Sequence, residues 1–267
     1  MAPQPRQETR PIITLTTDFG QQDGYVGSMK GVMMSICPTA TVIDLSHEIP
    51  PQNLSAAAFV LYQAFSYYPP HTVHCVVVDP GVGSKRRAIA VRTSHGLFVG
   101  PDNGVFSLVF STSGLNVFEA VTLTNSKYQL PAVSATFHGR DIFAPAAAHL
   151  AGGVPPGKFG PPAINLVRLD YGPSDENDLC RVIHIDHFGN LILDITVHDI
   201  ENPEQATFSV GQTVIRSLSH TFADVKEGEF VAYAGSTWDH IEIAMRNGNA
   251  ARELGVKLGD LVRVKRG

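Results

Sequence analysis

A carboxylate and two arginines flank a glycine-rich turn at the end of an almost wholly apolar run. The run Val73–Val78 stops at Asp79, and Pro-Gly-Val-Gly-Ser-Lys leads from there to Arg86 and Arg87. Such a turn leaves backbone N–H groups free to meet a ligand, beside side chains of both charges. Its residue order is not that of a phosphate-binding P-loop. The segment also fits a tight turn followed by a solvated basic edge.

Asp18 stands at a similar point, directly after the apolar run Ile12–Thr17 and before Phe19 and Gly20. A carboxylate at the end of a strand could accept both hydroxyls of a ribose. The alternative is that Asp18 caps the helix that follows.

His138 is the third candidate, in the segment Thr136-Phe137-His138-Gly139-Arg140-Asp141 that enters a helix. The positive end of a helix dipole disfavours protonation, so the imidazole is expected to be neutral. An ordinary histidine with satisfied hydrogen bonds would fit the same position.

The elements that must position these residues alternate between strands and helices. We expect strands over Ile12–Thr17, Thr41–Leu45, Val73–Val78, Ala88–Arg92, Leu97–Gly100 and Val117–Leu123, and helices over Tyr25–Ile36, Leu54–Tyr68, Asn103–Phe110 and Asp141–Leu150. This alternation indicates an α/β domain over 11–172 with a central, mostly parallel sheet. Ligands of such sheets gather outside the carboxyl ends of the strands, where the polar segments lie.

The pattern changes after Gly172. A polar linker with Asp175, Glu176 and Asp178 precedes short strands with turns, typical of an antiparallel β-barrel or sandwich over 178–267. The expected strands are Cys180–Ile185, Leu191–Ile195, Thr213–Ser217, Phe230–Tyr233, His240–Met245 and Leu261–Val264, with one helix over Ala250–Leu254.

Composition excludes several classes of protein. With 267 residues, 43% hydrophobic and 17% charged, the chain can bury a core and is not a disordered segment. The net charge of −5 argues against a nucleic-acid partner. No apolar stretch approaches the length that spans a membrane. The polar start of the chain predicts a loose arm without a secretion signal, and the three distant cysteines fit reduced thiols, so we expect a cytoplasmic protein.

A metal site is not expected. The best local cluster is His184-x-Asp186-His187, but alternation along a strand would send His187 to the opposite face. His71 and His74 have no partner cluster at ligand spacing.

Taken together, the motifs resemble a known family. TTDFG, DGYVGSMKG, IDLSHEIPP, VVVDPGVGSKRR, VGPDNG, TFHGRD, IDHFGN and TFAD follow one another in this order between Ile12 and Val264. In combination they are similar to the S-adenosyl-L-methionine (SAM) hydroxide adenosyltransferases, the adenosine-forming SAM hydrolases. These enzymes are relatives of the fluorinase and chlorinase, which attack SAM with halide.

The resemblance implies hydrolysis of SAM to adenosine and L-methionine by in-line attack of water or hydroxide on the ribose C5′. It implies a catalytic set of Asp79, Arg86 and His138. Arg86 is preferred over Arg87 because the family's arginine lies seven residues after its aspartate. Halide-using relatives carry a tyrosine where Asp79 stands, so the sequence favours water as the nucleophile.

The resemblance also implies the substrate contacts. Asp18 would bind the ribose hydroxyls and Asp186 the methionine ammonium. Asn190 would contact the adenine between the rings of Phe188 and Phe222. The backbone near Ser236 and Thr237 would meet the methionine carboxylate, although the Ser-Thr-Trp-Asp-His stretch there departs from the family pattern, and Gln52 would lie over the ribose. SAM is then a substrate, no cofactor is needed, and the expected assembly is a homotrimer with sites between subunits.

Three other functions remain as alternatives. A sensor would bind SAM or adenosine with negligible turnover. A halogenase would need halide, and a metal-dependent hydrolase would lose activity with a chelator.

Overall fold

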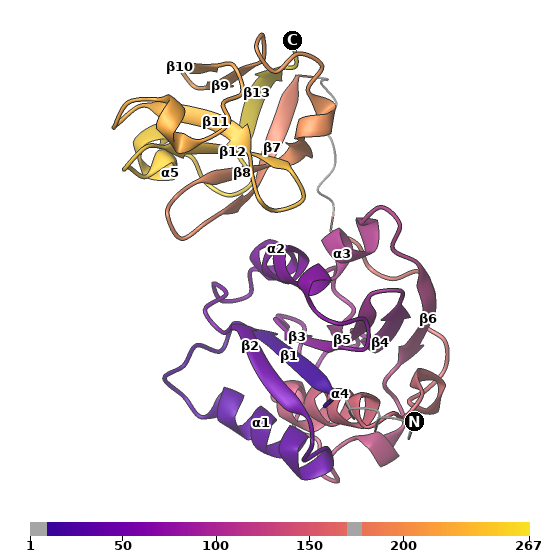
Figure 1. The fold of residues 1–267 in the computed structure, drawn as a ribbon. Coiled ribbons are helices and arrows are strands. Elements are labelled where there is room, and N and C mark those ends of the chain that lie inside the picture. Colours follow the sequence, from indigo (N-terminus) through magenta and orange to yellow (C-terminus); the bar gives the residue numbers. More distant parts are fainter. Residues whose placement is uncertain (1–9, 170–177) are drawn as a thin grey trace, which may run out of the picture. The chain divides into compact units, whose positions relative to one another are not determined.

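The computed structural model describes residues 10–169 and 178–267. The chain divides after Leu169 into two compact units, here called the N-terminal and the C-terminal unit (Figure 1). The predicted arm before residue 10 and the predicted linker residues Asp175 and Glu176 lie outside the described residues. The domain bounds 11–172 and 178–267 therefore stay a prediction.

The N-terminal unit is built on a six-stranded sheet with the order β2-β1-β3-β5-β4-β6. Strands β2, β1, β3 and β5 pair in parallel, as predicted, whereas β4 is antiparallel to both β5 and β6. The sheet is therefore mixed, because Ser94 and His95 join β4 to β5 as a tight hairpin. The strands are β1 (Ile12–Thr17), β2 (Thr41–Ser46), β3 (Val73–Val77), β4 (Ala88–Thr93), β5 (Gly96–Pro101) and β6 (Val117–Thr122).

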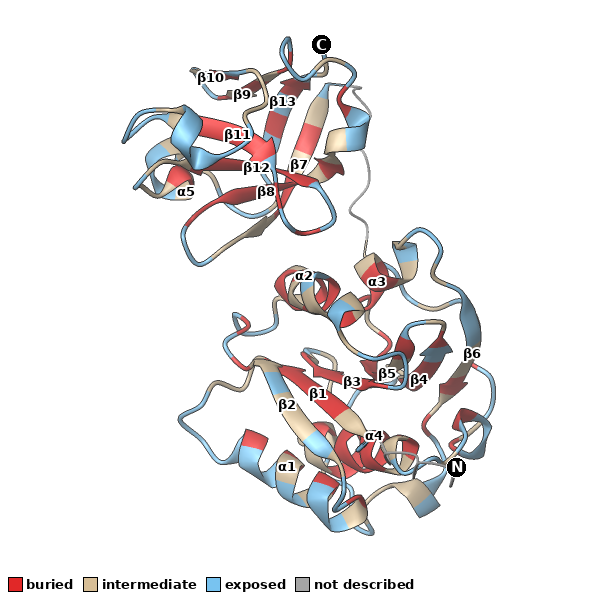
Figure 2. Cartoon of the chain, viewed as in Figure 1, coloured by how far each residue is buried: buried red, intermediate tan, exposed pale blue. Residues whose placement is uncertain are grey.

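Helices cover both faces of this sheet. Figure 1 shows α2 and α3 on one face and α1 and α4 on the other. Their bounds are α1 (Tyr25–Ile36), α2 (Leu54–Ala64), α3 (Ser107–Ser111) and α4 (Ala144–Ala151), with 3₁₀ turns at Phe65–Tyr67, Ser126–Tyr128 and Pro156–Lys158. Figure 2 shows the central strands buried, which explains why β3 is apolar at every position except that of the buried His74.

Two predicted helices differ from the structure at their starts. The helix expected from Asn103 begins at Ser107. The one expected from Asp141 is preceded by a π turn, Gly139–Phe143, and α4 begins only at Ala144. The N–H of Ala144 bonds to the carbonyl of Gly139, five residues back, and Pro145 has no N–H to bond to Asp141. The helix expected over Leu54–Tyr68 ends at Ala64.

The C-terminal unit is a seven-stranded antiparallel sheet with the order β10-β9-β13-β7-β8-β12-β11. Ser219, just after β10, forms a bridge with Tyr233 of β11, so the two edges of the sheet nearly meet. The predicted antiparallel β architecture is confirmed. Its elements are β7 (Leu179–Ile185), β8 (Leu191–Thr196), β9 (Thr207–Val210), β10 (Thr213–Arg216), β11 (Phe230–Ala234), β12 (His240–Met245), α5 (Ala250–Leu254) and β13 (Leu261–Lys265), with 3₁₀ turns at Val197–Asp199 and Phe222–Asp224. The strands expected from the sequence did not include β9.

Each unit has its own apolar core. In the N-terminal unit Leu15 and Phe143 are fully buried, and in the C-terminal unit Phe208 and Ile243 are. Cys37, Cys75 and Cys180 are free and buried, and burial raises the pKa of the Cys180 thiol to about 11. Within the described ranges, no helix has the length and apolar character needed to cross a bilayer.

Candidate active site

A cavity of about 340 Å³ opens at the carboxyl ends of β1 and β3. Asp18 follows β1, Asp79 follows β3, and His138 precedes the π turn; all three line the cavity, together with Gln52. Three segments that lie far apart in the sequence thus bring their polar residues to one place, as the sheet topology predicts.

Arg86 joins Asp79 to His138. Its Nε donates to Asp79 Oδ1 and Oδ2 at 2.9 and 3.0 Å, and its Nη2 also donates to Oδ2. The same Nη2 lies 2.8 Å from His138 Nδ1. The side chains of Arg86 and Asp79 are only 11% and 6% exposed, so each charge depends on the other for compensation.

This geometry fixes the proton on His138. A guanidinium carries only donors, so Nδ1 of His138 must accept, and the proton of the neutral ring lies on Nε2. Burial and the nearby positive charge of Arg86 lower the pKa of His138, and they outweigh the opposing effect of Asp79 and Asp141. The ring therefore stays neutral, in agreement with the expectation from sequence, and presents an N–H donor at Nε2.

Arg87 points to a different part of the unit. Its Nε donates to Asp102 Oδ2 at 2.7 Å, and its Nη1 and Nη2 donate to the carbonyls of Ile164 and Asn165 at 2.7 and 2.9 Å. Asp102 also accepts from the N–H of Val167 at 2.9 Å. Arg87 thus anchors the last described segment of the N-terminal unit, and Arg86 is the arginine that contacts Asp79.

The glycine-rich turn allows a close backbone approach. Gly83 has φ of +77°, and a Cβ there would lie 2.6 Å from the carbonyl oxygen of Ala135. Ala135 belongs to the loop that carries His138, so the turn and this loop pack directly against each other. A side chain at Gly83 would push apart the segments that bring Arg86 and His138 together.

Asp18 does not cap a helix. The N-cap position of α1 is Gly24, and Asp18 Oδ2 accepts the backbone N–H of Gln52 at 2.8 Å. Gln52 has φ of 64°, an uncommon conformation for a residue with a side chain. This bond holds the turn before α2 against the cavity.

His47 was not among the residues singled out from the sequence, yet it fixes the backbone on both sides of Asp18. Its side chain is fully buried, its Nδ1 lies 2.8 Å from Thr17 Oγ1, and its Nε2 lies 2.9 Å from Asp44. Thr17 Oγ1 accepts the N–H of Phe19 at 3.3 Å, and the His47 carbonyl accepts that of Gly20 at 2.8 Å. The signal was present, because His47 lies inside the motif IDLSHEIPP.

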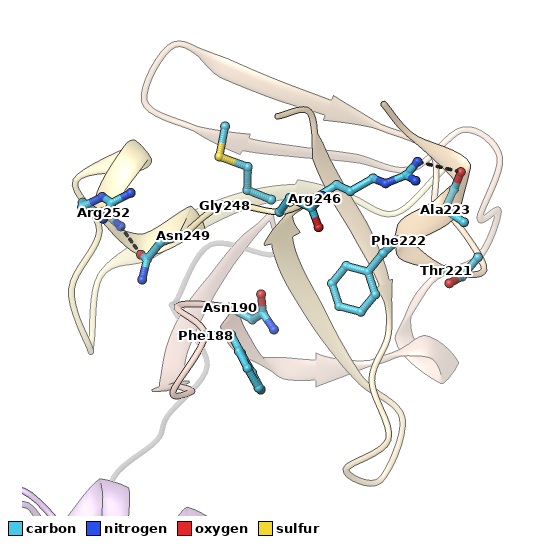
Figure 3. Close-up of a pocket in the computed structure, with 11 residues that line it drawn as sticks. Phe188, Asn190, Thr221, Phe222, Ala223, Arg246, Gly248, Asn249 and Arg252 are labelled. Carbon is cyan, nitrogen blue, oxygen red and sulfur yellow. Dashed lines mark hydrogen bonds between the residues drawn. The ribbon is translucent and has the colours of Figure 1, made fainter. Parts of the chain in front are cut away.

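A second pocket, of about 690 Å³, lies in the C-terminal unit. Figure 3 shows Phe188, Asn190 and Phe222 among its walls. Phe188 is 71% exposed and Phe222 40%, which is unusual for phenylalanine and leaves two ring faces available for a ligand. Phe222 rests on Tyr233, with 4.7 Å between the ring centroids.

Asp186 organises the loop that carries Phe188 and Asn190. Its Oδ1 accepts the backbone N–H groups of Phe188 at 2.9 Å and of Asn190 at 2.8 Å, and its Oδ2 accepts from Asn190 Nδ2 at 2.9 Å. Gly189 has φ of +87°, and a Cβ there would lie 2.2 Å from the side chain of Asn249. Asp186 therefore bonds to the loop on one side, and Asn249 packs against it on the other.

Ser236 and Thr237 lie outside this pocket, in the turn between β11 and β12. Ser236 is exposed and Thr237 is buried. The N–H of His240 donates to the Thr237 carbonyl at 3.1 Å, and Trp238 and Asp239 both have positive φ, which is the geometry of a type I′ hairpin turn. This tight turn is where the sequence departs from the family pattern.

No three His, Cys, Asp or Glu side chains of residues 10–169 and 178–267 gather as a metal ion would require. The two sets of candidate residues belong to different units: Asp18, Asp79, Arg86 and His138 to the N-terminal one, and Asp186, Phe188, Asn190, Phe222, Ser236 and Thr237 to the C-terminal one.

Comparison with known proteins decides the family. The model of the SAM hydroxide adenosyltransferase N-terminal domain matches residues 13–160, and that of the corresponding C-terminal domain matches residues 180–263. The chain belongs to the SAM hydroxide adenosyltransferase family. This confirms the resemblance found in the sequence motifs.

Named relatives match this chain over nearly its whole length. A protein of Salinispora tropica named (R)-S-adenosyl-L-methionine hydrolase is 43% identical, covering 96% of this chain and 98% of its own. One of the same name from Thermus thermophilus is 40% identical, covering 96% and 99%. The fluorinase of Actinopolyspora mzabensis is 29% identical, covering 97% and 98%. A crystal structure of an uncharacterized conserved protein from Thermotoga maritima matches with a TM-score of 0.87 at 35% identity, covering 95% and 100%.

Replacing Gly83 by alanine should lower the free energy of unfolding more than the same change at Gly114. Both glycines have positive φ, +77° and +76°, but open space surrounds Gly114. Gly114→Ala should cost about 1–2 kcal/mol for the backbone conformation alone. Gly83→Ala adds the collision with Ala135, and denaturant unfolding of both variants measures the difference. Equal losses would show that the close approach at Gly83 is not a constraint.

Proposed function

We propose that this protein hydrolyses SAM to adenosine and L-methionine. Curated relatives with 38–43% identity bear the name of SAM hydrolases. The observation in the structure that carries the proposal is the partly buried set Asp79–Arg86–His138: Asp79 and His138 line the N-terminal cavity, and Arg86 bonds to both. We propose Asp79, Arg86 and His138 as the catalytic residues, with no cofactor.

The chemistry of SAM sets what such a site must do. Its sulfonium leaves as a neutral thioether, so the leaving group needs no general acid. Water is the poor reactant, because its pKa in bulk is about 15.7 and it is a weak nucleophile. The site must therefore favour hydroxide, and a fixed positive charge can do so. As the C5′–O bond forms, the C5′–S bond breaks and its electron pair stays on sulfur, so the hydroxide and sulfonium charges cancel.

Arg86 supplies the fixed charge, since a guanidinium stays protonated in proteins. Asp79 keeps this cation in place and makes its burial tolerable. His138 offers its Nε2–H to the attacking oxygen and orients it, and the proton lost by water goes to solvent. The neutral ring cannot take that proton at Nε2, because Nε2 already carries one.

We further propose that the substrate is held by both units. Asp18 binds the ribose hydroxyls, with Gln52 beside them, while Phe188, Phe222 and Asn190 hold the adenine. Asp186 meets the methionine ammonium, and the backbone near Ser236 and Thr237 its carboxylate. By resemblance to the family, the two halves of one site come from neighbouring copies in a homotrimer. The three separated, free cysteines favour a cytoplasmic protein. The exposed rings of Phe188 and Phe222 support a shared site, because an exposed apolar ring needs another surface to cover it.

Incubation with SAM should yield adenosine and methionine, and Arg86→Ala should lower kcat by more than tenfold. Loss of one donor to a developing oxyanion costs about 2.7–4 kcal/mol in comparable sites. Arg87→Gln is the matched control, because Arg87 bonds to Asp102 and should affect stability more than turnover. Chromatography of the products measures both. The proposal fails if no adenosine forms above the spontaneous background, and the assignment of Arg86 fails if Arg87→Gln is the inactive variant.

The protein should remain active below pH 6.5, the ordinary pKa of histidine, when kcat/KM is measured against pH. Because burial and Arg86 lower the pKa of His138, the ring stays neutral as the pH falls through 6.5. The histidine therefore lowers activity only at lower pH, when Nδ1 protonates and repels Arg86, in addition to the decline that comes from the loss of hydroxide. His138→Gln can still accept from Arg86 and donate to water, but it does not titrate. It should keep part of the activity and lack this additional loss. The comparison of the two proteins isolates the histidine: an additional loss that begins at or above pH 6.5, or identical profiles for the unsubstituted protein and His138→Gln, would contradict the assignment.

Mixed oligomers test whether one site draws on two copies. Arg86→Ala damages only the N-terminal unit and Phe188→Ala only the C-terminal unit. Co-expressed with different tags and purified through both, they should regain activity, since some sites then combine two intact halves. Asp79→Asn co-expressed with Arg86→Ala should give no such recovery. Absence of recovery in the first pair would place the whole site within one chain.

A further inference from the structure

His47 connects the turn that carries Asp18 to a carboxylate at the edge of the sheet. The His47 side chain is fully buried, with Nδ1 2.8 Å from Thr17 Oγ1 and Nε2 2.9 Å from Asp44 Oδ1. Asp44 lies on the edge strand β2 and also pairs with Lys30 Nζ at 2.6 Å (Figure 1). Burial raises the pKa of Asp44, but its hydrogen bonds to Lys30 and His47 outweigh this effect and lower the pKa, so the group is a carboxylate.

The hydrogen positions along this chain of side chains are fixed at its carboxylate end. A carboxylate only accepts, so the His47 proton lies on Nε2, and Nδ1 of the neutral ring accepts the hydroxyl proton of Thr17. The Thr17 oxygen is then left to accept the N–H of Phe19 at 3.3 Å. The His47 carbonyl accepts the N–H of Gly20 at 2.8 Å. The backbone is thus bonded on both sides of Asp18.

The loop that carries His47 also holds the carboxylate of Asp18. Gln52 follows in the same loop, and its backbone N–H donates to Asp18 Oδ2 at 2.8 Å. This bond fixes one carboxylate oxygen, and the backbone beneath must fix the direction of the other. Asp18 lines the N-terminal cavity, so the contacts of His47 determine where this carboxylate points within it.

We propose that Thr17, His47 and Asp44 are positioning residues for ribose recognition: they hold Asp18 where its carboxylate can accept both hydroxyls of the ribose. This rests on the proposed function, in which Asp18 binds the ribose of the adenosyl group. None of the three lines the cavity, so they act through Asp18. A misplacement of about 1 Å is enough to cost a large part of an oriented interaction, so a loosened turn should lose the hydroxyl contacts.

Strand β1 offers a matched control for Thr17. Thr14 is also fully buried, and its Oγ1 lies 2.9 Å from Nδ1 of another buried histidine, His74. Thr14→Val and Thr17→Val each remove one buried Thr–His hydrogen bond and keep the branched shape of the side chain, so both should lower the free energy of unfolding by similar amounts. Because only Thr17 bonds within the Asp18 turn, only Thr17→Val should alter ribose recognition. Thr17→Ser keeps the hydroxyl and should preserve it.

The experiment is calorimetric binding of adenosine and 2′,3′-dideoxyadenosine, which lacks both ribose hydroxyls, to the whole protein. The unsubstituted protein, Thr14→Val and Thr17→Ser should bind adenosine about tenfold tighter or more than the dideoxy analogue. Thr17→Val should reduce this preference by about fivefold or more. In SAM hydrolysis, Thr17→Val should raise KM more than it lowers kcat, because the hydroxyls are bound both before and during the reaction. A purely structural role would leave the preference unchanged.

Two results would overturn the proposal: equal binding of the two nucleosides by the unsubstituted protein, or equal preferences in folded Thr17→Val and Thr14→Val. If Thr17→Val does not fold, Asp44→Ala takes its place, because Asp44 is one-third exposed and its loss leaves His47 Nε2 without this acceptor. Asp44→Ala should then lower the preference, whereas Lys30→Met, which keeps the carboxylate, should not. An unchanged preference in Asp44→Ala would count against the proposal.

Formation of adenosine from SAM by the same preparation tests the proposed reaction separately. Hydrolysis together with an unchanged preference in Thr17→Val refutes only the positioning role. The expected loss of preference in Thr17→Val without any hydrolysis refutes only the reaction.

Discussion

One buried cation constrains the N-terminal unit more than any other group. Removing a guanidinium from water costs several kcal/mol, so Arg86 can be 11% exposed only because Asp79 and His138 compensate it. These partners come from the end of β3 and from the loop before the π turn. The close approach of the turn at Gly83 to this loop follows from the same requirement. The fold thus holds three distant segments together around one charge.

The C-terminal unit uses the same principle in a different place. There a carboxylate, Asp186, orders the loop: the backbone N–H groups of Phe188 and Asn190 and the side-chain amide of Asn190 all donate to it. In both units a group that can only donate or only accept determines the hydrogen-bonding role of the next one. Arg86 makes His138 a donor at Nε2, and Asp186 fixes which way the Asn190 amide is turned.

The local elements could be predicted from sequence where the apolar spacing was long and regular. The bounds of β1 and α1 agree with the expectation residue for residue. Strand β9 was missed because Thr207–Val210 is only four residues long and its alternation is too short to stand out. The sheet was expected to be mostly parallel, and only β4 runs against the other strands, because its hairpin with β5 reverses the chain. The π turn Gly139–Phe143 changes the hydrogen-bond register by one residue, and so short a change is not visible in apolar periodicity.

For the site, the sequence could indicate which residue types gather at strand ends, but not how they bond. Arg86 and Arg87 are adjacent and alike, and only the fold shows that one contacts Asp79 and the other Asp102. Asp18 could equally have been a helix cap, until the structure showed its bond to Gln52. His47 was overlooked because a buried histidine in a loop motif has no periodic signal.

The central claim is that Arg86 holds His138 as a neutral ring with its proton on Nε2. Nitrogen-15 NMR of histidine-labelled protein near pH 7 tests this most directly, with the His138 signals assigned by their loss in His138→Gln. The account predicts a protonated Nε2 and an unprotonated Nδ1 that accepts a hydrogen bond. A ring protonated at Nδ1, whether neutral or as imidazolium, would contradict it.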